Sequence, residues 1–451
     1  HKDELKNILE ARTYADAERA VFKFPRKQKD NKYTNFFRNF KSFYEKLLHY
    51  QESHLDVLAN GFLSKCQIIE IKSWQIEQAI TMFNSLNSTG MPLSDADIIS
   101  AHLFSHASNK DEFKGIWEPI IQSADKLAQN KIINIDNVLQ QFMYINRSKE
   151  RQYSEGELTT PGVRKYYTVL YPELLETPDT LCDKFSKILR IWDKIQSYSI
   201  VKLMMKFNEN FKLFLISYLF RVPEDEITES NITPIVECLL RLFALLEVGD
   251  YSYSSRYFKT FLFNENFKLV DEAYKIEGIL EDFNKHISST WKEEDVLTDL
   301  MEYDKNILVY LNEYLYAKEH KKPFDFTPEK VNVEHIMPAS GHNIESVRVN
   351  ANLSKEEFED LVNLLGNKIL LEEDINKHIG MDWFQTKKGT LVQDKKGYVG
   401  SSFGIASALS SYPSNLWQKQ DIEAANEKAA TRICRFIFNK PLRDKVENMI
   451  E

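Results

Sequence analysis

The sequence is poor in cysteine, glycine and proline and has no excess of basic charge. Its four cysteines lie far apart and form no Cys-x-x-Cys pair, which argues against a zinc ribbon and a disulfide framework. With only 14 glycines and 13 prolines in 451 residues, turns are few, and a compact, helix-rich protein is favoured. The formal net charge of −9 excludes a protein that coats nucleic acid along its whole surface, so any DNA contact must come from local basic patches.

Long apolar runs and a signal segment are absent as well. No run approaches the roughly 20 residues that a membrane helix needs, so we expect no membrane partner and a cytoplasmic location. The length exceeds the size at which one hydrophobic core usually stops growing. We therefore expect three domains, over residues 1–105, 106–300 and 301–451.

Helical patterns dominate the first two thirds of the chain. Apolar residues recur at helical spacing over 181–206, 210–221 and 233–248, where no catalytic constellation is present. Near the start, Ser94 is placed to cap a helix that begins at Asp95. The expected fold is mainly α, with helical N-terminal and middle regions and a small α+β finger near the C-terminus.

That finger is predicted from a change of pattern after residue 330. Residues 331–336 alternate as a strand does, and residues 368–371 form a second, short apolar strand. Between them, Ser354 and Glu357 make a capping box for an inserted helix. A further helix can start at Asp374, which gives the order strand, helix, strand, helix of a ββα finger with an insertion.

Four residues of this finger suit metal-assisted phosphodiester hydrolysis. A neutral imidazole can take a proton from water near neutral pH, which suits His335 as general base. Mg²⁺ or Mn²⁺ prefers oxygen ligands, for which Glu334 and Asn376 are candidates. Asn367 is expected to bond across the loop and hold His335 in orientation.

Strand geometry places a condition on this site. Neighbouring strand residues point to opposite faces, so Glu334 and His335 can meet one substrate only if a twist or bulge ends the strand. A Glu-His dipeptide alone favours a structural role. Together with the strand context, Asn367 and Asn376, it favours a nuclease.

Two basic patches are candidate DNA contacts. Lys387, Lys388, Lys395 and Lys396 follow the finger and are candidate phosphate contacts. In the other patch, basic residues between 23 and 41 alternate with aromatics. Residues 36, 37, 40 and 43 of that patch, all phenylalanine, recur at helical spacing, so a buried stripe is favoured over a stacking platform.

Residues 333–338, residues 366–371 and Asn376 resemble the C-terminal HNH (His-Me finger) domain of GmrSD-type restriction endonucleases. The resemblance covers residues 300–451, where Ala425 stands in place of a family arginine. It implies restriction of foreign or modified DNA, a role in phage defence, and DNA as the partner. The alternative is a helical DNA-binding or assembly module whose finger is inactive in a truncated form. Homo-oligomerisation is left open.

Residues 83–94 resemble the second conserved block of the family's ParB-like N-terminal domain. The preceding blocks, Ile-Pro-x-x-Gln-Arg and Asp-Gly-Gln-Gln-Arg, are absent from the sequence. We therefore expect an N-terminally truncated chain, in which residues 1–105 are the helical remainder of that domain. A nucleotide is an expected partner only of a form that carries the missing blocks.

Overall fold

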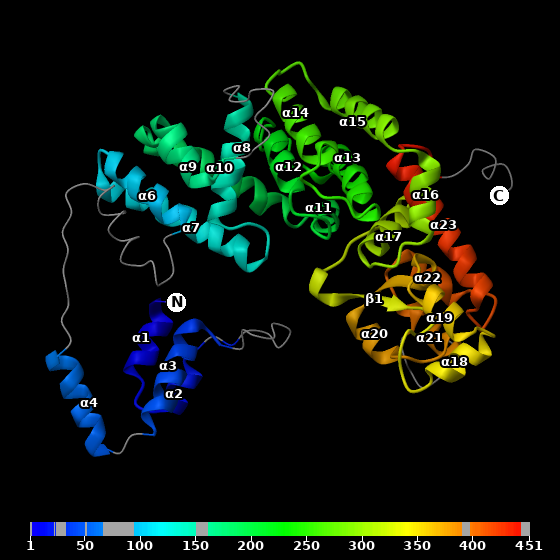
Figure 1. The fold of residues 1–451 in the computed structure, drawn as a ribbon, viewed down its shortest axis with the longest axis horizontal. Helices are drawn as coiled ribbons and strands as arrows, with labels where there is room; N and C mark the ends of the chain where they lie inside the picture. Colours follow the sequence, from blue (N-terminus) through cyan, green and yellow to red (C-terminus); the bar gives the residue numbers. More distant parts are fainter. Residues whose placement is uncertain are drawn as a thin grey trace. The chain divides into compact units, whose positions relative to one another are not determined.

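A computed structural model of the chain describes residues 2–21, 23, 33–49, 52–65, 94–149, 161–389 and 397–442. The chain divides into two compact units, residues 1–79 and 80–451 (Figure 1). Helices predominate in both units, and the described residues contain a single two-stranded sheet. The prediction of a mainly α fold is confirmed. The boundaries at residues 105 and 300 stay predictions.

The first unit is a small helical body. Its helices are α1 (Lys2–Glu10), α2 (Tyr14–Arg19), α3 (Asn35–Leu47) and α4 (Glu52–Lys65). Its core is formed by Ile8, Ala17, Val21 and Phe37. The predicted phenylalanine stripe is only partly right, because Phe37 is buried whereas Phe36 and Phe43 keep 39% and 66% of their surface exposed.

The second unit begins with an all-helical scaffold. Its helices are α6 (Asp95–His106), α7 (Lys110–Gln129), α8 (Ile135–Lys149), α9 (Val163–Lys165), the π-helical turn η1 (Tyr166–Leu170), the 3₁₀ turn η2 (Pro172–Glu176), α10 (Pro178–Ile195), α11 (Ser199–Met204), α12 (Phe211–Phe220), α13 (Glu229–Val248), η3 (Arg256–Thr260), α14 (Phe261–Lys268), α15 (Ile276–Thr290), α16 (Glu293–Met301) and α17 (Ile307–Glu319).

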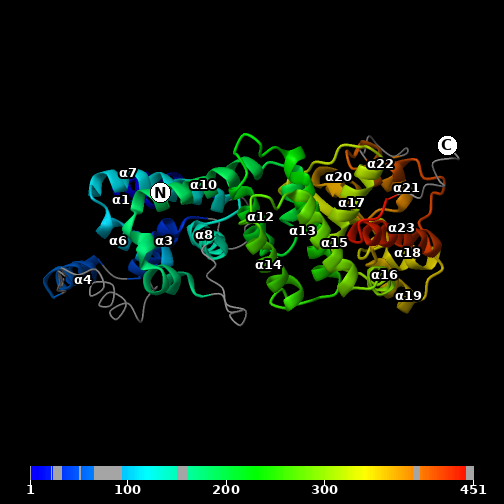
Figure 2. The same cartoon turned by 90° about the horizontal axis from the view of Figure 1, so that it is seen from above.

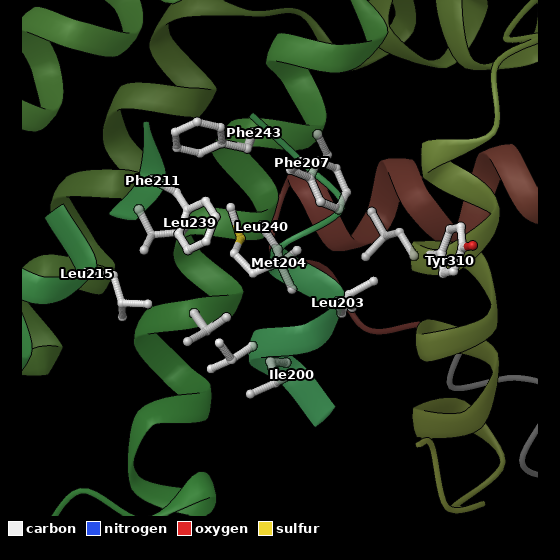
Figure 3. Packing of buried hydrophobic residues seen from close by; sticks show 14 of the residues in the cluster. Ile200, Leu203, Met204, Phe207, Phe211, Leu215, Leu239, Leu240, Phe243 and Tyr310 are labelled. Carbon is white, nitrogen blue, oxygen red and sulfur yellow. The ribbon is translucent and has the colours of Figure 1, made fainter. Parts of the chain in front are cut away.

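Large aliphatic and aromatic side chains fill this scaffold. Figure 3 shows how α11, α12 and α13 interlock and meet α17 through Ile200, Leu203, Met204, Phe207, Phe211, Leu215, Leu239, Leu240, Phe243 and Tyr310. The same apolar cluster runs on through the second unit to Ile437 in α23. Because this core is continuous, the scaffold gives the last third of the chain a packed support.

The last third contains the sheet. It comprises η4 (Pro328–Lys330), β1 (Val331–His335), α18 (Ile344–Asn350), α19 (Lys355–Val362), the 3₁₀ turn η5 (Leu365–Asn367), β2 (Lys368–Glu372), α20 (Glu373–Ile379), α21 (Phe384–Lys387), η6 (Tyr398–Gly400), α22 (Gly404–Ser410) and α23 (Lys419–Ile437). β1 and β2 are antiparallel, and α20 packs against both strands. The predicted strands and the helix after them are present.

The two helix N-terminal caps that the sequence predicts are present in the structure. Ser94 and Asp97 form a capping box at the start of α6, and Ser354 and Glu357 form one at the start of α19. Each box satisfies backbone N–H groups that the first helical turn leaves without partners. Residues 83–93, which were compared with a family block, lie outside the described residues.

The long helix α23 connects the scaffold to the sheet. It packs against α13, α16 and α17 (Figures 1 and 2). It also packs against η5, the turn that leads into β2. At the crossing, Asn426 Oδ1 accepts a hydrogen bond from Gly366 N over 3.1 Å, and Asn426 Nδ2 donates to Met301 O over 2.8 Å. Gly366 has no side chain, which allows this close approach.

Within the part of the chain that the structure describes, none of the helices has the length and apolar character needed to cross a membrane.

Candidate active site

The candidate site lies at the C-terminal end of β1. The ladder pairs Glu334 with Ile369 and His335 with Lys368 without a break. The expected bulge at the strand end is therefore wrong. In a regular strand, Glu334 and His335 must point to opposite faces, and the structure gives them different partners.

His335 is a partly buried imidazole beside the end of α19. Its Nε2 lies 3.3 Å from Oδ1 of Asn363, the residue that follows the last turn of that helix. Burial lowers the pKa of His335, and the nearby cations Lys368 and Lys387 lower it further, whereas the hydrogen bond to Asn363 opposes the shift. The ring is therefore neutral near pH 7. With Nε2 donating to the amide oxygen, Nδ1 carries the lone pair that can accept a proton.

Glu334 points into the protein. It is 7% exposed, and its Oε1 accepts a hydrogen bond of 2.5 Å from Nζ of Lys387, at the end of α21. Burial raises the pKa of Glu334 and lowers that of Lys387, and the mutual attraction of the two charges opposes both shifts. An ammonium group that donates to a carboxylate forms a charge-assisted hydrogen bond, which is stronger than a bond between neutral groups.

Lys387 also fixes the backbone around the histidine. Its Nζ donates to His335 O over 2.7 Å and to Ile336 O over 3.4 Å. The prediction that Lys387 contacts phosphate is therefore wrong, because its ammonium group is buried and has protein acceptors. The same prediction for Lys388 is wrong for the same reason, because Lys388 is 4% exposed and donates to Tyr412 O and Ser414 O. Lys395 and Lys396 lie outside the described residues.

Asn367 holds the loop that follows β1. Its side chain is fully buried, accepts a 2.8 Å hydrogen bond from Met337 N, and donates to Met337 O and Val362 O over 2.9 and 2.8 Å. Its own carbonyl oxygen accepts from Ile336 N over 2.9 Å. Asn367 therefore bonds across the loop, as expected, but it acts on the backbone after His335 and does not touch the imidazole.

Asn376 lies in α20, the helix that packs on both strands. Its side chain is half-buried, and among the residues that the structure describes it makes no hydrogen bond. The same residues contain no group of three His, Cys, Asp or Glu side chains that could hold a metal ion. Among the described residues, the fully buried Tyr398 hydroxyl has no hydrogen-bond partner, and it lies within electrostatic reach of Glu334. This leaves a polar group beside Glu334 unsatisfied.

The two candidate ligands, an amide oxygen and a carboxylate, are of the kind that a hard divalent cation prefers. Their positions in the structure suit such a cation less well. Asn376 is available as a ligand. Glu334 is not, because Lys387 already neutralises it and because it faces away from His335. The ion pair would have to open before Glu334 could bind a cation.

One residue of the site, Asn363, was not predicted from the sequence, and a second, Lys387, was given the wrong role. Asn363 stands in an ordinary Val-Asn-Leu context, and nothing in its spacing distinguishes it. Lys387 was noticed, but its charge was assigned to the surface. The site therefore contains a neutral imidazole, that of His335, whose Nδ1 can accept a proton. Asn367 and Lys387 hold the backbone at the end of its strand by hydrogen bonds.

Two family models match the sequence of this chain. Residues 254–431 match the C-terminal domain of GmrSD restriction endonucleases, and residues 1–104 match the N-terminal domain of the GmrSD restriction endonuclease. Together the two matches span more than half of the chain. No curated protein matches it.

Proposed function

The chain belongs to the GmrSD restriction endonuclease family, and from this premise we propose that it is an HNH-type endonuclease that hydrolyses phosphodiester bonds in foreign or modified DNA. The family accounts for the nuclease activity and for DNA as substrate. The HNH type, the dependence on a metal and the roles of individual residues are our proposal.

The observation that carries the proposal is the state of His335. Phosphodiester hydrolysis needs a base that is unprotonated near neutral pH and aimed at a water molecule. Burial and the cations Lys368 and Lys387 keep the imidazole of His335 neutral, and Asn363 fixes Nε2. His335 then takes the water proton at Nδ1. Asn367 and Lys387 act as positioning residues that hold the backbone after the base.

A metal ion is the second part of the proposal. When bound, Mg²⁺ or Mn²⁺ would stabilise the negative charge that develops on the phosphate and on the leaving oxygen. Asn376 would supply one oxygen ligand, and Glu334 a second in a conformation in which its ion pair with Lys387 is open. That pair is closed in the structure.

The Glu334–Lys387 pair also favours one alternative. If it stays closed in solution, the chain is a helical DNA-binding or assembly module with an inactive finger. Cleavage under defined metal conditions separates the two functions.

The test is a nicking assay on supercoiled plasmid with Mg²⁺, Mn²⁺ or EDTA. The wild-type chain is expected to cut with either metal and not in EDTA. His335→Ala removes the base, and general-base catalysis of this kind is worth about 10²–10⁴-fold. We expect the rate of nicking to fall by that factor.

The matched control is His378→Ala, which removes an exposed histidine of α20 close in sequence to Asn376. This variant should cut like the wild type. Equal cutting by the wild type and His335→Ala would disprove the role of His335. An absence of cutting under every metal condition would favour the inactive-finger alternative.

A further inference from the structure

A hollow of about 360 Å³ lies in the scaffold, between α13, α15, α17 and the end of α23. Its charged lining residues are Glu237, Arg241, Lys318 and Lys440. Apolar side chains, among them Leu280 and Phe436, line the rest. None of these residues belongs to the candidate active site, and none has a part in the function proposed above.

Arg241 is the unusual member of this lining. It is 3% exposed, in the middle of α13. Its Nη1 donates to Asn284 Oδ1 over 2.5 Å, and its Nη2 lies 3.2 Å from Cys238 Sγ. Among the described residues, no carboxylate forms an ion pair with it. A guanidinium keeps its charge at any pH at which a protein is folded. Arg241 is therefore a buried cation whose only described partners are an amide and a thiol.

The other cations of the hollow are already paired. Lys318 contacts Glu237, which also accepts a 2.6 Å hydrogen bond from the hydroxyl of Tyr314. Lys440 contacts Glu293. These two ion pairs balance the lysine charges, so among the described residues the positive charge of Arg241 is left without a counter-charge.

Burial of an unpaired charge is costly, and buried cations normally have an anionic partner. Arg241 has five N–H donors in a planar fork that matches the oxygens of phosphate or carboxylate groups. The uncompensated charge of Arg241 favours an anionic group, and Leu280 and Phe436 offer an apolar wall to an organic substituent. A pocket of several hundred cubic ångströms is the usual size for a small ligand.

We propose that this hollow binds the phosphate group of a small molecule, with Arg241 as its principal ligand. The phosphate receives the free donors of the Arg241 fork and lies within the field of Lys318 and Lys440. Inorganic phosphate and organic phosphate monoesters share this chemistry, and an organic substituent adds contact with the apolar wall.

The test measures binding of inorganic phosphate and of a nucleoside 5′-monophosphate by calorimetry on the whole chain, at an ionic strength held constant with chloride. Hydrogen exchange with and without each probe locates the site. We expect binding with slower exchange in residues 234–242 and 436–442. Tighter binding of the monophosphate than of inorganic phosphate would show that the organic part of the ligand contacts the apolar wall. Equal binding of the two would show that the site recognises the phosphate group alone.

Arg241→Gln keeps a polar side chain and removes the charge. It should weaken phosphate binding about tenfold or more, the usual effect of losing hydrogen bonds to a charged group. Arg256→Gln is the control, because Arg256 is an exposed arginine of the same unit whose guanidinium contacts Tyr257 and does not line the hollow. It should bind like the wild type.

A second variant covers the case in which Arg241→Gln does not fold. Lys440→Gln changes a half-exposed residue at the hollow and should also weaken binding, by a smaller factor. The proposal fails if neither probe binds, if Arg241→Gln binds as tightly as Arg256→Gln, or if Lys440→Gln and the exchange pattern both show no difference from the wild type.

Discussion

Glu313 is a carboxyl group that the fold buries almost completely. It lies in α17 with 1% of its surface exposed, and it accepts hydrogen bonds from Gly404 N and Ile405 N at the start of α22, over 2.5 and 3.2 Å. Burial raises the pKa of Glu313 to about 7 despite these bonds. The carboxyl group therefore takes up a proton in the folded state at a pH at which it is ionised in the unfolded chain.

This shift predicts a pH-dependent stability. Because the folded pKa is raised, the contribution of Glu313 is fully present below about pH 4.5 and is lost as the pH rises to about 7. Over that window the free energy of unfolding should fall by an amount on the order of 3 kcal/mol. Glu313→Gln removes the titration, so its stability relative to the wild type should rise between pH 5 and pH 8 in urea unfolding.

The control for Glu313 is Glu359→Gln, which changes an exposed acid of α19. Its stability difference from the wild type should be the same at both pH values. If Glu313→Gln behaved like this control, the raised pKa of Glu313 would be refuted.

The Glu334–Lys387 pair predicts a large effect of a single substitution. Lys387→Met leaves a buried carboxylate without its partner, which typically costs about 3–5 kcal/mol. The midpoint of urea unfolding should fall accordingly. Lys377→Met is the control, because its pair with Glu373 is 70% exposed on the lysine side and should contribute little. Equal midpoints for the two variants would show that the buried pair does not form in solution.

At the scale of elements, η5 and α23 cross in close contact near the site. A Cβ added to Gly366 would lie 2.2 Å from Ile422 O and 2.4 Å from Asn426 N, which are backbone atoms that cannot rotate away. Gly366→Ala should therefore cost about 1–3 kcal/mol or more in the free energy of unfolding. Because Asn367 follows directly, plasmid nicking should fall as well.

Gly115→Ala provides the matched comparison. Nothing lies within 4 Å of a Cβ at this position in α7, so alanine should stabilise the helix by up to about 1 kcal/mol and leave nicking unchanged. If both variants had the stability of the wild type, the contact of η5 with α23 would be looser than the structure shows.

Elements of this chain were predictable where the signal is local. The alternation of residues 331–336 and the apolar run from 368 gave both strands, and the Ser354–Glu357 spacing gave the start of α19. These signals depend on side chains that are a few residues apart, so they can be recognised in a single sequence.

The rest depends on contacts between distant residues. Whether Lys387 faces solvent or Glu334 is decided by the packing of α21 against β1, 53 residues away in the chain. Asn363 reaches His335 because α19 ends beside the strand, and no spacing rule encodes that approach. Helical spacing extends over the whole segment 181–206, but α10 ends at Ile195 and α11 starts at Ser199.

At the scale of the whole molecule, the charge balance limits how DNA can be held. The net charge is −9, and Lys387 and Lys388 are buried, so of the four lysines predicted to contact phosphate only Lys395 and Lys396 are left as candidates. Each phosphate contact adds about one to the slope of log affinity against log salt concentration. Lys395→Gln/Lys396→Gln should reduce that slope by about two, measured by fluorescence anisotropy on duplex DNA in a His335→Ala background.

The control is Lys355→Gln/Lys377→Gln, which removes the same charge from two exposed lysines with 78% and 70% side-chain exposure. Its slope should match that of His335→Ala alone. Equal slopes for the two double variants would mean that Lys395 and Lys396 do not contact phosphate.

The passage of α23 across η5 also bears on protein engineering. A truncated domain that contained only the two strands and α20 would end well before residue 419. It would lack α23, the helix against which the turn at Gly366 packs. Such a domain would need other groups to replace the hydrogen bonds that Asn426 makes to Gly366 and Met301. The transplantable unit therefore has to run through Ile437, and a fusion partner is best attached beyond that helix.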